Sequence, residues 1–286
     1  MIGQFLLGFR EALEAALIVA IILAYLKRTG RDALSRYAWY GVCLAVASSI
    51  VLGVSIWFVY GGLAESSKTL FEGVAALFAV LVLSSMIYWM GTKGKELRTE
   101  LERRVEAVVT RGAVLGLASF SFIVVFREGL ETVLFLVPFL PSDFAGTVAG
   151  ALLGVVASSV LAYAIYAVGM RIDIRVFFYF TSILLVLLAG GLAGYGVHEL
   201  AEYAEGVGIE LGWLGKYAYT LNIPEDSPFH HKGMVGSVLA VMFGYTVRAE
   251  WIRVIVHVAY LLISLPIVIM IYRRNVNGRR SKAATE

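Results

Sequence analysis

Long apolar runs separated by short polar stretches make up most of the chain. A helix needs roughly 20 mainly apolar residues to cross a bilayer, and seven of the runs reach that length. The pattern therefore predicts an all-α polytopic membrane protein with seven transmembrane helices. A further apolar run at 237–247 is too short to span and predicts an interfacial or re-entrant helix. The seven expected spans are residues 4–26, 37–60, 70–90, 113–139, 144–170, 177–196 and 251–272.

The first and fourth predicted spans carry the same charged motif. Residues 9–14 read Phe-Arg-Glu-Ala-Leu-Glu, and residues 126–131 read Phe-Arg-Glu-Gly-Leu-Glu. An ionised side chain at the bilayer centre costs roughly 2.5–3.5 kcal/mol on insertion scales, and each motif holds three of them. Because two helices carry this cost in matching form, the repetition predicts a functional polar site within the membrane. The alternative is a pair of structural Arg–Glu bridges that lock helices together.

The spacing of the two motifs predicts an internal repeat. Three helices separate equivalent positions, so the two motif helices must run in opposite directions across the membrane. This is the arrangement of an inverted-topology repeat of three helices against three, in which the substrate site lies near the midplane. We expect one transmembrane permease domain over 1–286. It comprises repeat one at about 1–92, repeat two at about 112–200, an outer loop at about 201–250 and an unpaired seventh helix at about 251–272.

The distribution of basic residues sets the expected orientation. Lysine and arginine gather after the first, third and fifth spans and in the tail, at 27–36, 93–111, 171–175 and 273–282. By the positive-inside rule these segments are cytoplasmic, which places the N-terminus outside and the C-terminus in the cytoplasm. The charge-rich 93–111 connector carries opposite charges four residues apart, which predicts a solvated helix. Most acidic residues outside the motifs fall in the outer loops or at outer helix ends, where they would concentrate cations.

Residue spacing within each motif indicates the chemistry of the site. On a helix, residues three and four apart share a face, so each motif presents its arginine beside its glutamates. If the two helices cross at their motifs, four carboxylates and two guanidiniums meet with a formal charge of −2. Such an oxygen-only site suits a hard cation, and iron, manganese, calcium and magnesium all remain open. We expect Glu11, Glu14, Glu128 and Glu131 as metal ligands, and Arg10 and Arg127 as residues that position the carboxylates.

Four polar residues at outer helix ends are expected to form a metal approach path. Glu72 lies just inside the third span, and the alternative for it is a charge that complements the helix dipole. His198, Glu199 and Glu202 share a face at the end of the sixth span, with interfacial polarity as the alternative. The other histidines are not expected to bind a metal. We expect the pair at 230–231 to be solvated and the one at 257 to be packed and hydrogen-bonded.

Two R-E-x-x-E motifs on helices one and four of a seven-helix chain resemble the oxidase-dependent iron permease family. The resemblance extends over nearly the whole chain and includes Phe71-Glu72-Gly73 and His198-Glu199-Leu200-Ala201-Glu202. It implies a multi-pass cell-membrane permease that imports iron, in the ferric form, bound by Glu11, Glu14, Glu128 and Glu131. Iron is then the transported substrate, and no resident cofactor is implied. The resemblance also implies an external partner that oxidises or delivers iron.

The same residues argue against three other functions. A membrane carboxylate di-metal oxidoreductase would use glutamates on facing helices, but such sites also use Glu-x-x-His ligands, which both motifs lack. A metal sensor would need a cytoplasmic domain, which the short loops do not provide. An ATP-driven pump is excluded for this chain because no G-x-x-x-x-G-K-[ST] stretch occurs. A non-enzymatic permease is therefore preferred, with another metal cation as an alternative substrate.

Overall fold

The computed structural model describes residues 2–93, 97–110, 114–141, 143–167, 174–230 and 233–283. The chain divides into two compact units, one of residues 1–62 and 95–172 and the other of residues 63–94 and 173–286. Each expected repeat contributes its first two helices to the first unit and its third helix to the second unit. The short stretches 94–96 and 171–173, which entered the orientation argument, lie outside the described residues, as does His231.

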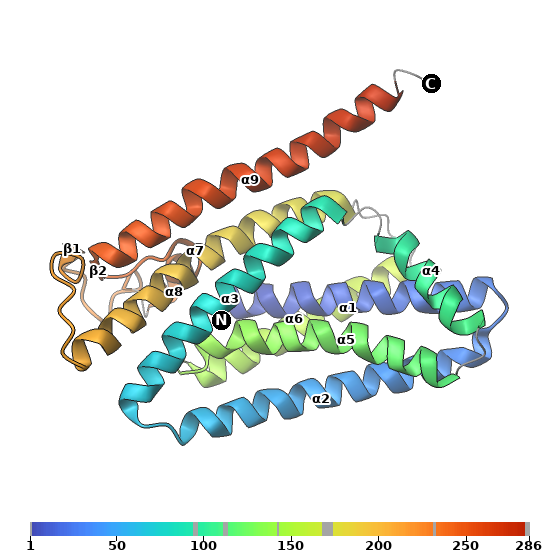
Figure 1. The fold of residues 1–286 in the computed structure, drawn as a ribbon, viewed down its shortest axis with the longest axis horizontal. Coiled ribbons are helices and arrows are strands. Elements are labelled where there is room, and N and C mark those ends of the chain that lie inside the picture. The colour runs from blue at the N-terminus through green and yellow to red at the C-terminus, as the bar shows by residue number, and fades with distance from the viewer. Residues whose placement is uncertain are drawn as a thin grey trace. The chain divides into compact units, whose positions relative to one another are not determined.

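The first unit is a bundle of long helices joined by short turns (Figure 1). Helix α1 packs along α6 and α5, while α2 packs along α5 and α4 lies against α1. Two short 3₁₀ turns, η1 and η2, begin or end the neighbouring helices. The bounds are α1 Ile2–Arg28, η1 Asp32–Leu34, α2 Ser35–Gly61, α4 Leu97–Thr110, α5 Val114–Leu136, η2 Val137–Phe139 and α6 Phe144–Ala167.

The second unit is built on α7, which packs against α3, α8 and α9. A two-stranded antiparallel sheet, β1 with β2, lies at one end of these helices (Figure 1). Its register pairs Tyr217 with Glu250 and Thr220 with Arg248. The bounds are α3 Glu65–Lys93, α7 Ile174–Gly206, β1 Tyr217–Thr220, α8 Met234–Phe243, β2 Arg248–Glu250 and α9 Trp251–Ala283.

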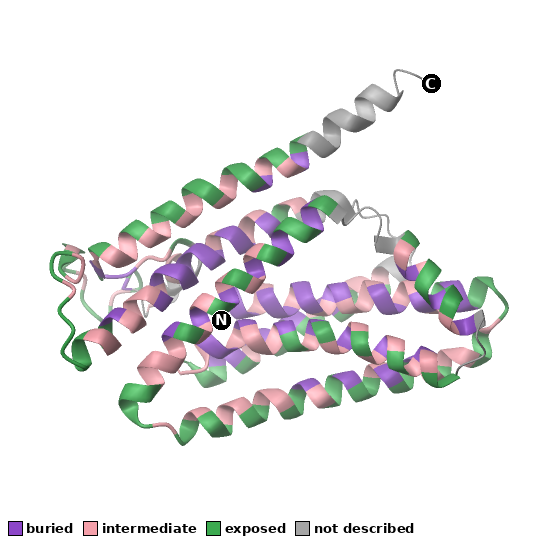
Figure 2. Cartoon of the chain, in the orientation of Figure 1, coloured by how far each residue is buried: buried purple, intermediate pink, exposed green. Residues whose placement is uncertain are grey.

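Five described helical segments are long and apolar enough to cross a membrane, and they correspond to α2, α3, α6, α7 and α9. The two motif helices are of similar length, 27 residues for α1 and 23 for α5, but each carries three charged residues in its middle. Large apolar side chains such as Val51, Phe58 and Leu152 are exposed on the helix surfaces. Figure 2 shows such exposure along much of α2, whereas α1 is mostly buried or half-buried. This distribution fits an α-helical membrane protein, whose outer surface contacts lipid.

The turn after α1 shows how the sequence ends a long helix. Gly30 adopts a left-handed conformation with φ of 69°. Its N–H donates to the Lys27 carbonyl at 3.1 Å, and the Arg31 N–H donates to the Leu26 carbonyl at 2.8 Å. These two bonds form a Schellman motif, which satisfies the last carbonyls of the helix. Gly30 therefore fixes where the first span stops and the polar loop begins.

The charge-rich connector is helical, as predicted, and forms α4. The Arg104 side chain donates to Glu100 at 2.8 Å and lowers the pKa of that carboxyl. Arg28 at the end of α1 donates to Glu102 at 3.0 Å, so the connector is tied to the first helix. These pairs are exposed, and exposed ion pairs stabilise a fold only weakly. The buried face of α4, which includes Leu101 and Val105, joins the apolar core with Ile22 and Leu26 of α1.

The outer segment departs from the sequence predictions in two respects. The small sheet was not expected in an all-α chain, because strands of four and three residues give no recognisable alternation. His230, which we expected to be solvated, is buried and only 5% exposed. The predicted short helix is confirmed as α8, although it spans Met234–Phe243 and ends at the left-handed Gly244. Its interfacial or re-entrant placement stays a prediction.

The structure gives α9, the helix without a repeat partner, a clear packing role. Its Tyr260 hydroxyl shares a hydrogen bond of 2.8 Å with Ser84 of α3, and its Tyr272 hydroxyl shares one of 3.1 Å with Ser182 of α7. Gly190 and Gly194 of α7 face α9, and added Cβ atoms there would contact Leu261 and Arg253. Helix α9 therefore joins α3 and α7 through both polar contacts and close approach.

Two glycines allow the backbones of α1 and α6 to approach closely beside the first motif. A Cβ added at Gly154 would lie 2.5 Å from the Phe5 carbonyl oxygen and 2.5 Å from the Phe9 nitrogen. A Cβ added at Gly8 would lie 2.8 Å from the Ala151 carbonyl oxygen. Small residues at helix crossings permit such contact in membranes. This crossing holds the backbone of α1 against α6 just before Arg10.

We expect Gly154→Ala to destabilise the protein by about 1–3 kcal/mol, because the added methyl group has no room between the two backbones. Unfolding of the purified protein in detergent measures the effect. Gly61→Ala is the matched control, since a Cβ at that position meets nothing within 4 Å. Equal stability of the two variants would contradict the role assigned to the crossing.

Candidate metal site

The two motif helices lie side by side in the first unit and run in opposite directions (Figure 1). This is the relative direction that the repeat predicts. The motifs meet where α1 crosses α5, so glutamates that are 117 positions apart in the sequence become neighbours. All the residues of the two motifs belong to the first unit.

Arg10 holds two carboxylates of its own motif. Its Nη1 donates to Glu11 Oε1 at 2.6 Å, and its Nη2 lies 2.6 Å from Glu14 Oε1. The Arg10 side chain is only 4% exposed, and both glutamates are buried. A planar guanidinium can contact two carboxylates at once from fixed directions, which an ammonium group cannot do. The geometry agrees with the positioning role that the sequence predicts for Arg10.

Arg127 occupies the equivalent position of the second motif but has a different environment. Its Nε donates to Glu131 Oε1 at 2.8 Å. The Arg127 side chain is 51% exposed, whereas Arg10 is almost fully buried. The two motifs are therefore alike in sequence and unlike in surroundings. The arginine of the first motif is buried within the helix bundle, and the arginine of the second motif is exposed.

Three of the four predicted ligands come together. Glu11, Glu128 and Glu131 each offer one carboxylate oxygen, and these three oxygens lie within 4.8 Å of one another. All three residues are buried. Each of them also has a buried oxygen, Oε2, with no hydrogen-bond partner among the described residues. Buried polar atoms are normally satisfied, so three orphaned oxygens in one cluster are suited to interact with a cation or to bind protons.

The fourth predicted ligand, Glu14, is buried beside this cluster but is not part of the close group of three. Its Oε1 is the oxygen that Arg10 contacts. Sequence spacing places Glu14 on the same face as Glu11, but it does not determine which oxygens converge. The structure thus distinguishes a central group of three carboxylates from a fourth that lies outside it.

Two more buried oxygens occupy equivalent positions in the motif helices, and no sequence pattern distinguishes them. Gln4 Oε1 and Ser121 Oγ are buried and have no hydrogen-bond partner in the described part of the chain. Gln4 precedes Glu11 by seven residues, and Ser121 precedes Glu128 by seven, so each lies two turns away on the same helix face. Because the helices are antiparallel, the polar face extends beyond the carboxylates in both directions.

Close packing against α2 supports the second motif. The glycine of that motif, Gly129, faces Ser49 of α2, and a Cβ at 129 would clash with the Ser49 hydroxyl. One end of the same interface brings Gly41 of α2 against the backbone of α5 at Ala118. Glycine is therefore required where the second motif has Gly129, although the first motif has Ala12 there.

The second unit contains the residues predicted as an approach path, gathered at the C-terminal part of α7. His198, Glu199 and Glu202 offer ligand atoms that lie within 4.8 Å of one another. Glu202 is exposed, and the other two are half-buried. His198 Nδ1 also lies 3.1 Å from Glu250 Oε2, which sequence reasoning counted only as an outer-face acid. This cluster combines imidazole with carboxylates, unlike the all-carboxylate group of the first unit.

Glu72 is held by a residue that sequence analysis did not identify. The Tyr195 hydroxyl donates to Glu72 Oε2 at 2.5 Å, joining α7 to α3. Gly73 and Gly196 follow these two residues and face each other, so the helices approach closely at this point. The only sequence feature that could have indicated this contact is a tyrosine three residues before His198. Tyrosines are common in this chain, so that position does not stand out. Glu72 is thus fixed in orientation within the second unit.

The chemistry available at the first-unit site follows from its charges. Four buried carboxylates and two guanidiniums leave a formal charge of −2, and all potential ligand atoms of the motifs are oxygens. Like charges at this distance in a low dielectric repel one another strongly, so binding of a cation would relieve the repulsion. Oxygen ligands favour hard cations, and no thiolate or imidazole is present in either motif.

Comparison with known proteins agrees with these observations. Residues 1–273 match the model of the Iron permease FTR1 family. The chain is 45% identical to an uncharacterized protein of Archaeoglobus fulgidus, with 96% of both chains covered. It is 31% identical to a protein of Escherichia coli O6:K15:H31 named ferrous iron permease EfeU, covering 98% of this chain and 100% of that protein. It is 33% identical to the protein of the same name from Yersinia pestis, covering 93% and 92% of the two chains. No solved structure matches the chain significantly. The chain belongs to the iron permease family of membrane proteins.

Proposed function

We propose that this chain is a cell-membrane permease that imports iron through the glutamates of its two R-E-x-x-E helices. The observation that carries the proposal is the buried group of Glu11, Glu128 and Glu131, whose orphaned oxygens require positive charge. Glu14 is the fourth carboxylate of the proposed site, and Arg10 and Arg127 position the ligands. Iron is the cargo of this site, and the proposal includes no resident cofactor.

The oxidation state of the iron has two candidates. Ferric iron is the form implied by the resemblance to oxidase-dependent permeases, and a hard trivalent cation suits an all-oxygen site. Ferrous iron is favoured by a separate observation, since the E. coli and Y. pestis relatives carry the name ferrous iron permease. The formal charge of −2 at the site would also be balanced by a divalent ion. We propose ferric iron as the bound form, supplied by an external protein that oxidises or delivers it.

We further propose that Glu72, His198, Glu199 and Glu202 attract and guide the cation at the outer face. The cluster on α7 is partly exposed, so it can bind and release an ion rapidly. Its mixture of one imidazole and several carboxylates is a weaker site for a hard cation than a buried carboxylate group. Such a surface cluster raises the local cation concentration, which increases the rate of capture.

The central test is iron uptake into liposomes that contain the purified protein. Glu131→Gln is expected to reduce uptake by more than about tenfold, because changes even to the outer shell of a metal site cost about 10–100-fold. Glu11→Gln, Glu14→Gln and Glu128→Gln test the other ligands in the same way. Glu225→Gln, at an exposed outer position, is the control.

The same liposomes distinguish the substrates. Iron is supplied either as a ferric chelate or as ferrous iron with a reductant, and manganese, calcium and magnesium serve as competitors. Uptake of the ferric form alone supports the first candidate, and uptake of the ferrous form alone supports the second. Normal iron uptake by the Glu131→Gln protein would refute the proposed site.

Arg10→Lys is expected to lower uptake by about 10- to 100-fold, because loss of a residue that holds metal ligands in place typically has an effect of this size. Lysine keeps the charge but cannot contact Glu11 and Glu14 together from one plane. Half-saturating iron concentration and maximal rate are both measured in liposomes, and folding is checked in detergent. Arg28→Lys is the control, because Arg28 makes an exposed pair with Glu102. A fully active Arg10→Lys protein would show that charge alone is needed.

Glu199→Gln is expected to raise the half-saturating iron concentration with a smaller change in maximal rate. The effect should shrink at high salt, because exposed charges are screened within roughly 8 Å at physiological ionic strength. Uptake curves at low and high salt measure both quantities, and Glu210→Gln at an exposed position is the control. A loss of maximal rate with unchanged half-saturation would assign Glu199 to the translocation step instead.

A further inference from the structure

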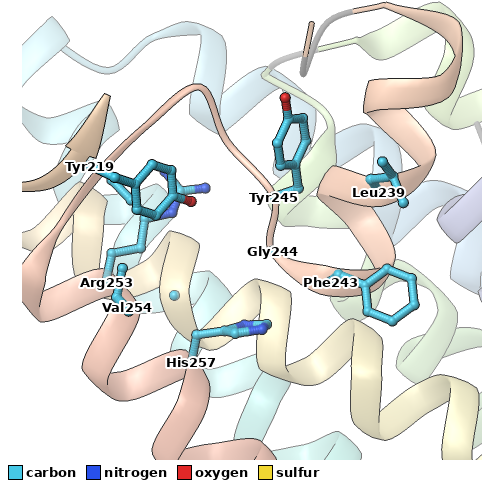
Figure 3. A pocket seen from close by; sticks show the side chains of 10 residues that line it. Tyr219, Leu239, Phe243, Gly244, Tyr245, Arg253, Val254 and His257 are labelled. Atoms are coloured by element: carbon cyan, nitrogen blue, oxygen red, sulfur yellow. The ribbon is translucent and has the colours of Figure 1, made fainter. Parts of the chain in front are cut away.

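A cavity of about 320 Å³ lies in the second unit between α7, α9 and the segment that connects α8 to β2. Figure 3 shows the side chains around it. Arg253 and His257 project from successive turns of α9, and Tyr219, Phe243 and Tyr245 provide aromatic walls. Gly194 of α7 lines the same cavity. The motif glutamates belong to the other unit, and none of them lines this cavity.

Arg253 has no anionic partner among the described residues. Its guanidinium makes no hydrogen bond or ion pair within the described part of the protein, and its Nε is fully buried. Glu199 and Glu250 are the nearest acidic groups that attract it, but neither is close enough to form an ion pair. Glu250 instead contacts His198 at 3.1 Å. Arg253 is half-buried in the first turn of α9, and a partly buried charge is favoured when an anion accompanies it.

His257 adds a second unsatisfied group one helical turn away. Its Nδ1 is buried and has no hydrogen-bond partner among the described residues, which contradicts the hydrogen-bonded role predicted from the sequence. The imidazole lies against Gly244, where an added Cβ would approach Nδ1 to 2.7 Å. Gly244 is left-handed, with φ of 62°, so the backbone itself covers this side of the ring.

Three other donors near the cavity are already engaged. The Tyr245 hydroxyl donates to the Phe229 carbonyl at 3.1 Å. The N–H groups of Trp251 and Ile252, at the start of α9, donate to the carbonyls of Lys216 and Leu214 at 3.0 and 3.1 Å. The first backbone donors of the helix are therefore unable to serve a ligand. In the described part of the chain, Arg253 Nε and His257 Nδ1 are the buried side-chain nitrogens of this cavity lining that have no hydrogen-bond partner.

We propose that this cavity binds an oxyanion, a phosphate or carboxylate group, through Arg253 and His257. A guanidinium matches the planar geometry of such groups, and the imidazole N–H of His257 supplies a second donor from the next turn. The aromatic walls suit a ligand whose charged head is attached to an apolar or ring-bearing body. The chemistry fits two sources: the headgroup phosphate of a lipid and a free small oxyanion.

The test uses the full-length protein in two binding experiments. In the first, protein is extracted from vesicles of phosphatidylglycerol and phosphatidylcholine, and the lipid that remains bound is measured by native mass spectrometry. In the second, inorganic phosphate is titrated against delipidated protein in detergent, and the thermal unfolding midpoint is followed. The variants are Arg253→Gln and His257→Gln. Arg248→Gln, an exposed arginine on the neighbouring strand, is the control.

Arg253→Gln is expected to weaken binding by about tenfold or more, which corresponds to the loss of a hydrogen bond to a charged group. Retention of phosphatidylglycerol by wild type and Arg248→Gln, but not by Arg253→Gln, identifies a lipid headgroup. A phosphate-dependent midpoint shift without lipid retention identifies a free oxyanion.

Folding is checked first, by the unfolding midpoint without any anion. If Arg253→Gln fails to fold, His257→Gln gives the same comparison, because glutamine is similar in size and keeps the helix face polar. Wild-type protein that retains no lipid and shows no shift with phosphate would overturn the proposal. Equal binding by wild type, Arg253→Gln and His257→Gln would overturn it as well.

Discussion

The cost of burying charge on α1 and α5 governs the organisation of the first unit. Six ionisable side chains lie within two otherwise apolar helices, and five of them are buried. Arginine cannot give up its charge, and an isolated buried charge is far too costly to keep. Each guanidinium meets carboxylates of its own motif, because Arg10 contacts Glu11 and Glu14 and Arg127 contacts Glu131. The crossing of α1 and α5 then brings the carboxylates of both motifs together, and buried oxygens without a hydrogen-bond partner among the described residues remain in the centre. A fold that leaves this remainder buried is suited to a cation that comes and goes.

Glycines allow close packing of each motif helix against a neighbouring helix. Gly8 and Gly154 bring α1 onto α6 next to Arg10, and Gly129 brings α5 onto α2 within the second motif. Backbone contact at these points holds both motif helices in place beside the charged residues. The second unit uses the same device, because Gly73 and Gly196 meet directly beside the Glu72–Tyr195 hydrogen bond. In both units, polar side chains are positioned where backbones approach most closely.

Sequence pattern was sufficient for the features that depend on periodicity. The long helices, the helical connector α4 and the antiparallel pairing of the motif helices all follow from runs of residues and from helix counting. It was insufficient where geometry between distant residues decides the outcome. Helical spacing could not separate Glu14 from the group that contains Glu11, because that depends on the rotation of α1 against α5. The His198–Glu250 and Tyr195–Glu72 contacts join residues 52 and 123 positions apart, and no local pattern predicts them. The seven-helix count and the outside position of the N-terminus stay predictions.

The two proposed cation sites differ in a way that suits permeation. Conduction requires binding that is favourable enough to admit an ion and weak enough to release it. At the outer cluster, exposure and the surrounding water limit affinity. In the buried site, water cannot do so, and four carboxylates alone would hold iron very tightly. At the proposed site, Arg10 and Arg127 would compete with the metal for the same carboxylates, because each guanidinium already bonds to oxygens that could be ligands. When the ion leaves, bonds to arginine would replace part of the interaction energy that the carboxylates lose. The arginines would thereby lower the free energy of the empty site and make release of the ion feasible from within the protein core.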